Sequence, residues 1–237
     1  MTTAVGRVVG LARFPVKSMR GESLEEVSLG FQGVPGDRRY AFVQADSRSP
    51  FPWLTGREYP ALVRYAPAFE VAVPRPRLLV TTPAGEIHPV DSDALRAELE
   101  GASGRRLFLL GDHRGSYDIA QVSLITVATI RAIAGAAGVD PDPWRFRMNI
   151  VIDTGSDIPF TEAGWVGQRL AVGEGARVAV TEPDKRCAMI TIDPGTAATN
   201  PAVLKAAADL NGATAGVYGS VVAAGIVRPG DGVAAEG

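Results

Sequence analysis

Short runs of alternating apolar and polar residues dominate the first hundred residues of the chain. An apolar side chain at every second position is the pattern of a strand with one buried face. The runs expected to form strands cover 5–16, 24–34, 38–46, 69–90 and 105–111. The run 69–90 is long enough for a hairpin, and Pro83-Ala84-Gly85 supplies its turn.

Three segments predict helices. The first begins after Asp91 or Ser92 and stops near Gly101. The second, 123–138, has apolar residues at helical spacing, with Ser123 or Thr126 as its cap and Gly138 at its end. The third follows Asn200 as N-cap, has Pro201 at its first position and ends before Gly212. Further strands are expected over 146–153, 169–173, 177–182, 188–193 and 221–233.

Many short strands and few helices indicate a β-rich α+β fold built on a β-barrel, rather than a doubly wound sheet. The uncharged stretch 210–227 approaches the length of a membrane span, but its four glycines make it weakly apolar. Turns and strands explain this stretch better than a bilayer helix.

Composition narrows the function classes. The net charge of −2 gives no global attraction to nucleic acid or to anionic membranes. One cysteine excludes internal disulfides, cysteine-ligated iron–sulfur clusters and multi-thiolate zinc sites, and two histidines leave little room for a histidine-built metal site. The N-terminal residues lack a signal-peptide pattern, so we expect a cytoplasmic protein without a membrane partner.

Four short windows place basic residues beside turn signals: 16–21, 36–39, 145–149 and 184–187. Lys17 and Ser18 lie between a proline and a glycine, where main-chain N–H groups are expected to be free for an anion. If the windows converge, they form an anion pocket suited to phosphate or carboxylate.

The third window is expected to lie on a strand. Alternation then places Arg145, Arg147 and Asn149 on one face and Phe146 on the other.

Cys187 follows Lys185 and Arg186 directly. Neighbouring cations favour the thiolate, which is the nucleophilic and metal-binding form of cysteine. The window therefore permits a metal ligand, a sulfur carrier or a redox nucleophile, and the lack of a second cysteine weakens the redox interpretation. A lone cysteine can also be an inert small hydrophobe.

These windows, taken in order, resemble the MOSC family, which is named for the C-terminal domain of molybdenum-cofactor sulfurase. The similar segments run from about residue 6 to 232: LARFPVKSMRG, GVPGDRRYAFV, LTGREYPAL, RFRMNIVID, FTEAGWVGQRLAVG, RCAMITIDPGT and GVYGSVVAAGIVRPGD. The resemblance implies a β-rich N-terminal domain over 1–110, interlocked with a MOSC β-barrel domain over 111–237.

The resemblance also implies a site for the pterin-based molybdenum cofactor. By similarity to amidoxime-reducing enzymes, Cys187 would ligate molybdenum, the cofactor's dithiolene would give the other soft ligands, and Asp118 would lie near the metal. The residues that would hold the pterin and phosphate are Lys17, Ser18, Arg38, Arg147, Asn149, Lys185 and Arg186.

Three hypotheses follow. The first is a molybdenum oxidoreductase that reduces small N-hydroxylated or N-oxide substrates; because the sequence has no ferredoxin domain after residue 237, it would take electrons from an external ferredoxin- or cytochrome-type reductase. The second is a sulfur-transfer protein that carries a persulfide on Cys187, with pyridoxal phosphate only on a desulfurase partner. The third is a carrier that binds the cofactor without turnover.

Overall fold

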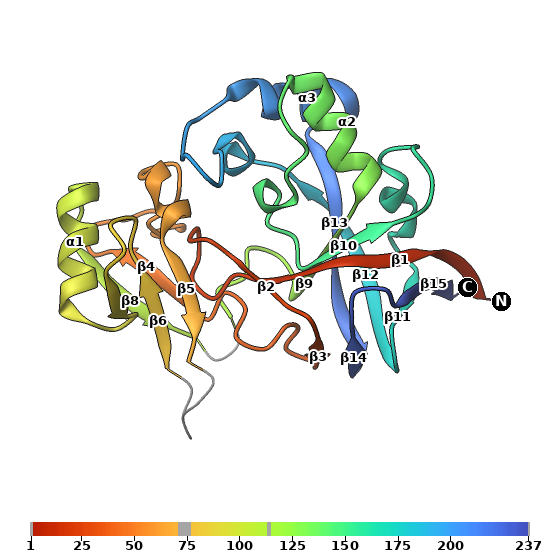
Figure 1. The fold of residues 1–237 in the computed structure, drawn as a ribbon, viewed down its shortest axis with the longest axis horizontal. Coiled ribbons are helices and arrows are strands. Elements are labelled where there is room, and N and C mark those ends of the chain that lie inside the picture. Colours follow the sequence, from red (N-terminus) through yellow and green to blue (C-terminus); the bar gives the residue numbers. More distant parts are fainter. Residues whose placement is uncertain (1, 71–76, 113–114, 237) are drawn as a thin grey trace.

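The computed structural model describes residues 2–70, 77–112 and 115–236. Seven strands close into a barrel in the order β10-β9-β13-β12-β11-β15-β1, because β1 pairs with β10 as well as with β15 (Figure 1). The β-rich α+β fold expected from the sequence is confirmed. The barrel strands are β1 Thr2–Arg13, β9 Val122–Thr126, β10 Ile150–Asp153, β11 Arg169–Val172, β12 Ala176–Lys185, β13 Thr214–Ala223 and β15 Gly232–Glu236.

Strand β1 interlocks the two halves of the chain. It comes from the N-terminal end of the sequence, yet Thr2 pairs with Glu236 and Leu11 pairs with Ile150. A second link joins β3 (Val27–Leu29) to β14 (Gly225–Val227). The barrel therefore needs residues from both halves, and the division at 110/111 stays a prediction about domains rather than a clean break in the chain.

The remaining N-terminal elements form a smaller unit beside the barrel (Figure 1). It has its own apolar core, in which Leu95 and Leu99 of helix α1 are fully buried. Its elements are β4 Tyr40–Gln44 paired with β8 Leu107–Gly111, the sheet of β5 Ala66–Phe69, β6 Leu78–Thr81 and β7 Ile87–Pro89, and α1 Asp93–Ser103, while β2 Glu22–Ser23 pairs with β1.

Strand β9 explains the largest error in the helix predictions. The expected helix 123–138 begins only at Val127, as α2 (Val127–Ala137), because the first four residues belong to β9. Every residue of β9 is buried: Val122 and Leu124 face the barrel core, and Ile125 packs against the helices. A strand buried on both faces has no alternation to separate it from a helix. Thr126, one of the two expected caps, accepts the capping hydrogen bond.

The other two helices were predicted more closely. Helix α3 (Pro201–Asn211) has Asn200 as its N-cap and Gly212 beyond its end, as expected. Helix α1 begins after Ser92 but continues past Gly101 to Gly104, where φ is 66°. The helix ends at the glycine that takes the left-handed conformation, so the expected stop near Gly101 was wrong.

Several strand predictions also need correction. The segment 188–193 is not a strand: Ala188–Thr191 form a 3-10 helix. Of 146–153 only β10 is extended, and 221–233 is divided among β13, β14 and β15.

The hairpin turn at 83–85 is confirmed, since Gly85 has φ 90° and donates its N–H to the Thr82 carbonyl. Part of the expected hairpin, 71–76, lies outside the described residues. Within the described ranges, none of the helices has the length and apolarity needed to cross a bilayer.

Candidate functional site

A cavity of about 380 Å³ opens where the smaller N-terminal unit meets the barrel. Residues from all four basic windows line it, and so do the strand β13 and the segment that precedes β9. Its lining residues are Lys17, Ser18, Arg38, Phe51, Trp53, Thr55, Arg57, Tyr117, Asp118, Ile119, Ala120, Ser123, Phe146, Arg147, Asp184, Lys185, Arg186, Cys187, Met189 and Tyr218. The convergence expected from the sequence is therefore present in the fold.

The lining carries an excess of positive charge. Among the described residues, two carboxylates, Asp118 and Asp184, face six cationic side chains. The six are Lys17, Arg38, Arg57, Arg147, Lys185 and Arg186. Such an excess in a concave site favours an anionic ligand.

Three lining residues have an unusual backbone conformation. Ser18, Arg38 and Arg147 have φ values of 64°, 48° and 57°, in the left-handed region that side chains rarely adopt. Each such residue costs of the order of 1 kcal/mol or more, and clusters of them mark ligand sites. The left-handed backbone at these three residues directs the first three basic windows toward one cavity.

Arg38 and Arg147 form the floor of the cavity around Phe14. The guanidinium carbons of Arg38 and Arg147 lie 5.1 Å and 4.5 Å from the centre of the Phe14 ring. Arg38 donates to the Arg147 carbonyl at 2.8 Å, and Arg147 donates to the Met19 carbonyl at 2.6 Å. These contacts fix both guanidinium groups before any ligand arrives.

The two arginines differ in their charge partners. Buried Asp37 forms an ion pair with Arg38 and accepts the Phe14 N–H at 2.6 Å. Burial lowers the pKa of Arg38, but Asp37 and Tyr218 raise it by more. The pKa of Arg38 therefore lies above its ordinary value. Arg147 has no salt bridge to a described residue, and burial together with Arg38 lowers its pKa to about 9. Arg147 is thus the cation that an anionic ligand would stabilise most.

Lys17 and Asp118 meet at one wall. The Lys17 ammonium lies 2.6 Å from Asp118 Oδ1 and 3.2 Å from the Ser116 carbonyl oxygen. It also lies 5.7 Å from the centre of the Trp53 ring. Burial lowers the pKa of Lys17, with Asp118 opposing that shift. A proton-carrying pair therefore faces the cavity.

Cys187 also lines the cavity. Strand β12 runs up to Lys185, and Cys187 directly precedes the 3-10 helix that begins at Ala188, without a capping hydrogen bond from its side chain. The side chain is exposed, so Cys187 is not a buried small hydrophobe.

Arg186 and Asp184 hold the segment before Cys187 in place. Arg186 pairs with buried Asp184 and donates to the Phe146 carbonyl at 2.6 Å. Burial raises the pKa of Asp184, and Arg186 opposes that shift. The Nε of Arg186 is buried without a hydrogen-bond partner in the described structure, which leaves one charged donor for a ligand.

Two residues of the third window do not face the cavity. Arg145 and Asn149 do not lie on a strand as expected. Residues 143–145 form a 3-10 helix, the positive φ of Arg147 turns the chain, and β10 begins only at Ile150. The Arg145 guanidinium instead binds Asp193 at 2.9 Å. The shared face expected for Arg145 and Arg147 was therefore wrong.

Asn149 is 1% exposed and outside the cavity lining. It accepts hydrogen bonds from Ser123 N–H and Oγ, and it donates to the Ala12 carbonyl. Asn149 therefore lies outside the cavity, where its side-chain hydrogen bonds connect β1 and β9 to the residue that precedes β10.

The first window also differs in detail. The main-chain N–H of Lys17 is not free, because it donates to the Tyr40 carbonyl at 2.8 Å. The Lys17 contribution to the cavity is its ammonium group.

The apolar rim of the cavity was not predicted from the sequence. Phe51 and Ile119 line the cavity and are 58% and 47% exposed, and Trp53 lies beside them. Thr55 and Arg57 could have been found, since they belong to the segment LTGREYPAL. Asp184 lies within the cysteine window itself. Phe51 and Trp53 reach the cavity by tertiary contact alone.

The model for the MOSC domain matches residues 111–234, and the model for the MOSC N-terminal beta barrel domain matches residues 5–119. The chain belongs to the MOSC domain family. Both domains expected from the sequence are thus confirmed as family members, in the expected order.

One solved structure shares this fold over nearly the whole chain. The YUAD protein from Bacillus subtilis aligns over 99% of this chain and 96% of its own, with 15% identity and a TM-score of 0.52. YiiM from Geobacillus stearothermophilus aligns over 50% of this chain and 55% of its own, with 17% identity and a TM-score of 0.40. No curated protein matches the sequence.

Proposed function

We propose that this MOSC protein binds the molybdenum cofactor in the cavity of about 380 Å³ and reduces N-hydroxylated or N-oxide substrates. The observation that carries the proposal is the position of the single cysteine. Exposed Cys187 lines the same cavity as six cationic side chains. A soft metal ligand and an anion-binding surface in one site suit a metal that is carried by an anionic organic group.

The residues present fit that group. The cofactor's phosphate would be held by Arg38 and Arg147, which are preset by their contacts with Phe14. The unpartnered Nε of Arg186 offers a further donor. The positions proposed for the remaining contacts are Lys17, Ser18 and Lys185, while Asn149 would act only by supporting the strands behind the cavity through its bond to Ala12.

When bound, the molybdenum cofactor supplies two-electron, oxygen-atom-transfer chemistry at the metal. The Cys187 sulfur would ligate the metal. Reduction of an N–OH group to N–H releases water and consumes two electrons and two protons. The Lys17 ammonium would hold a proton beside the cavity, and the Asp118 carboxylate, 2.6 Å away, would accept a proton and pass it on.

The apolar rim would receive the substrate. Phe51, Trp53 and Ile119 give the cavity an apolar edge opposite its cationic floor. A substrate with an apolar body and a polar N–O group could bury the body there while the N–O group points inward. Electrons would come from a separate ferredoxin- or cytochrome-type reductase, because one cysteine cannot hold an iron–sulfur cluster by thiolates.

The exposure of Cys187 favours one alternative. An exposed thiolate can meet the active site of a partner protein, so Cys187 could carry a persulfide from a desulfurase. A cofactor carrier without turnover is the non-catalytic variant of the first proposal.

Purification from two hosts separates these functions. The protein is made in a host that synthesises the cofactor and in one that cannot, and molybdenum per chain is measured. Near-stoichiometric metal from the first host alone supports the cofactor proposal, and reduction of an amidoxime or N-oxide by chemically reduced protein then separates the enzyme from the carrier. Metal-free protein with a persulfide mass adduct on Cys187 contradicts it in favour of sulfur transfer.

A further inference from the structure

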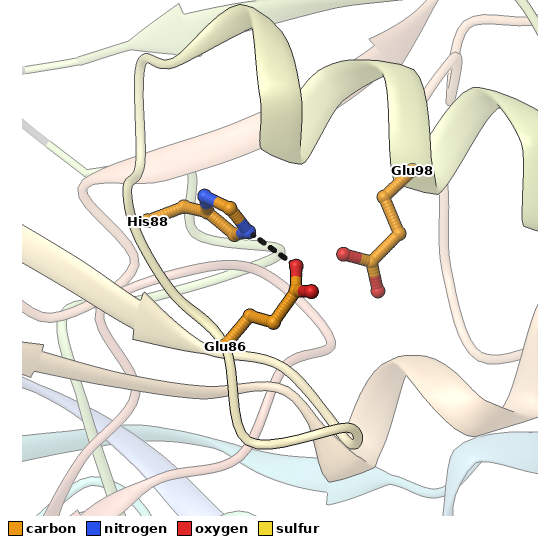
Figure 2. Close-up of side chains that lie close together, drawn as sticks. All are labelled: Glu86, His88 and Glu98. Atoms are coloured by element: carbon orange, nitrogen blue, oxygen red, sulfur yellow. Dashed lines mark hydrogen bonds and ion pairs between the residues drawn. The ribbon is translucent and has the colours of Figure 1, made fainter.

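A second group of metal-ligating side chains lies in the N-terminal unit, away from the cavity. Figure 2 shows Glu86, His88 and Glu98 directed toward one another from two elements. One ligand atom from each residue lies within 4.8 Å of those of the other two, and the His88 Nε2 atom is 3.1 Å from Glu86 Oε2. None of the three lines the cavity that contains Cys187.

The fold brings them together for simple reasons. Glu86 and His88 are two positions apart at the start of β7, so their side chains lie on one face of the strand. Helix α1 packs against β7 and presents Glu98 from its second half. The main chain on both sides is anchored, since His88 pairs with Val80 in the sheet and Leu95 and Leu99 are buried beneath the helix.

A buried tyrosine orients the Glu98 carboxylate. The hydroxyl of Tyr65, a residue that is 1% exposed, donates to Glu98 Oε1 at 2.7 Å. A buried donor that fixes a ligating carboxylate is the usual support of a metal ligand. The second oxygen of Glu98 remains available for the ion.

The imidazole distinguishes this group from an ordinary acidic patch. Two carboxylates and one imidazole suit a borderline transition-metal ion such as Zn²⁺, whereas Mg²⁺ and Ca²⁺ prefer oxygen ligands alone. Ligand atoms around a tetrahedral zinc ion are roughly 3.3 Å apart, from bonds of about 2.0–2.1 Å. Small rotations of the exposed Glu86 side chain and of the His88 side chain would therefore bring the three ligand atoms to that spacing.

We propose that Glu86, His88 and Glu98 bind one Zn²⁺-type divalent ion, with water completing the coordination. The ion joins β7 to α1 and so fastens the hairpin of β6 and β7 to the helix that covers it. This site is independent of the proposed cofactor site and does not rest on the proposed function.

The test uses the full chain with Cys187→Ser, which removes the thiol as a competing zinc ligand. Zn²⁺ is titrated by calorimetry, and the imidazole ¹⁵N signals are followed by NMR. With two histidines in the sequence, two sets of imidazole signals are expected. We expect one Zn²⁺ per chain, a shift of one imidazole set, and no competition from millimolar Mg²⁺.

Variants identify the ligands. His88→Gln and Glu98→Gln should each weaken Zn²⁺ binding at least tenfold, and Tyr65→Phe should weaken it by about tenfold through the lost support of Glu98. His113→Gln, which changes the other histidine, should leave the affinity unchanged. The proposal is overturned if no saturable binding is found, or if His88→Gln binds as tightly as its parent, which would leave the Glu86–His88 contact as a salt bridge only.

Discussion

Arg38 donates a hydrogen bond from its guanidinium group to the main-chain carbonyl of Arg147, 2.8 Å away and 109 positions later in the chain. Both residues have positive φ, and both guanidinium groups contact the Phe14 ring. The contact joins the N-terminal unit to the loop before β10 at the floor of the cavity. It makes the anion site a product of both halves of the chain.

If Arg38 and Arg147 hold one ligand, as proposed, they should not act additively. Replacing either by Ala removes a charge-assisted hydrogen bond of about 1.5–3 kcal/mol, so cofactor affinity should fall roughly tenfold to a hundredfold. The double variant should lose less than the sum of the two losses in binding free energy. Cofactor occupancy, read by pterin fluorescence after oxidative release, measures each step.

The matched control is Arg105→Ala, which changes an exposed arginine outside the cavity. It should leave occupancy unchanged. An equal loss in this control, or strict additivity of the two cavity variants, would mean that the arginines do not share a ligand.

Asp118 offers a test of proton supply. Asp118→Asn keeps the size of the side chain and an oxygen for Lys17 but removes the carboxylate that can accept and pass on a proton. If the pair delivers protons, turnover should fall by about a hundredfold or more while cofactor content stays normal. Steady-state kinetics with metal analysis checks both. Asp46→Asn, at an exposed surface pair with Arg106, is the control and should change neither quantity.

Asn149 should matter for stability more than for contact with a ligand. Asn149→Ala would leave the buried Ser123 N–H and Oγ and the Ala12 carbonyl without their partner. We expect a loss of about 2–4 kcal/mol in the free energy of unfolding by urea. Asn211→Ala, which removes one hydrogen bond to Thr214 at a part-buried position, should lose about 1 kcal/mol or less. Equal losses would contradict the bridging role of Asn149.

The fold could be predicted from the sequence where the local signal was strong. Asn200, Pro201 and Gly212 set the limits of α3, and glycine turns bounded several strands. Strand β9 could not be recognised, because burial on both faces removes the alternation that identifies a strand.

The candidate site could also be predicted only in part from the sequence. The basic windows could be found because turns place them at the ends of elements, and the cavity gathers eight of the nine proposed site residues. Asn149 was misplaced because the strand expected to carry it starts at Ile150, and the positive φ of Arg147 turns the chain just before it. Phe51 and Trp53 carry no local signal, since only tertiary packing brings them to the rim.

The affinity for an anion should depend on pH above neutrality. Burial lowers the pKa of Lys17. Below that pKa the ammonium group attracts the ligand, whereas above it binding requires uptake of a proton. Affinity should therefore fall as pH rises through the lowered pKa of Lys17. Calorimetric titration of inorganic phosphate from pH 7 to 10 measures this.

The variant Lys17→Gln should bind phosphate more weakly at pH 7 and lose less affinity as pH rises, because the titrating cation is gone. An affinity that is constant from pH 7 to 10 in the parent protein would show that the Lys17 ammonium group does not contribute to anion binding.

The most direct test concerns the metal and Cys187. X-ray absorption at the molybdenum edge counts the sulfur atoms around the metal in the parent protein and in Cys187→Ser, both made in a cofactor-producing host. Serine packs acceptably at this exposed position but is a harder donor than a thiolate. If Cys187 is the ligand, the parent shows the two dithiolene sulfurs and one more, and the variant either loses molybdenum or shows one sulfur fewer. Unchanged metal content with the same number of sulfur neighbours in both proteins would contradict the assignment of Cys187 and the site built around it.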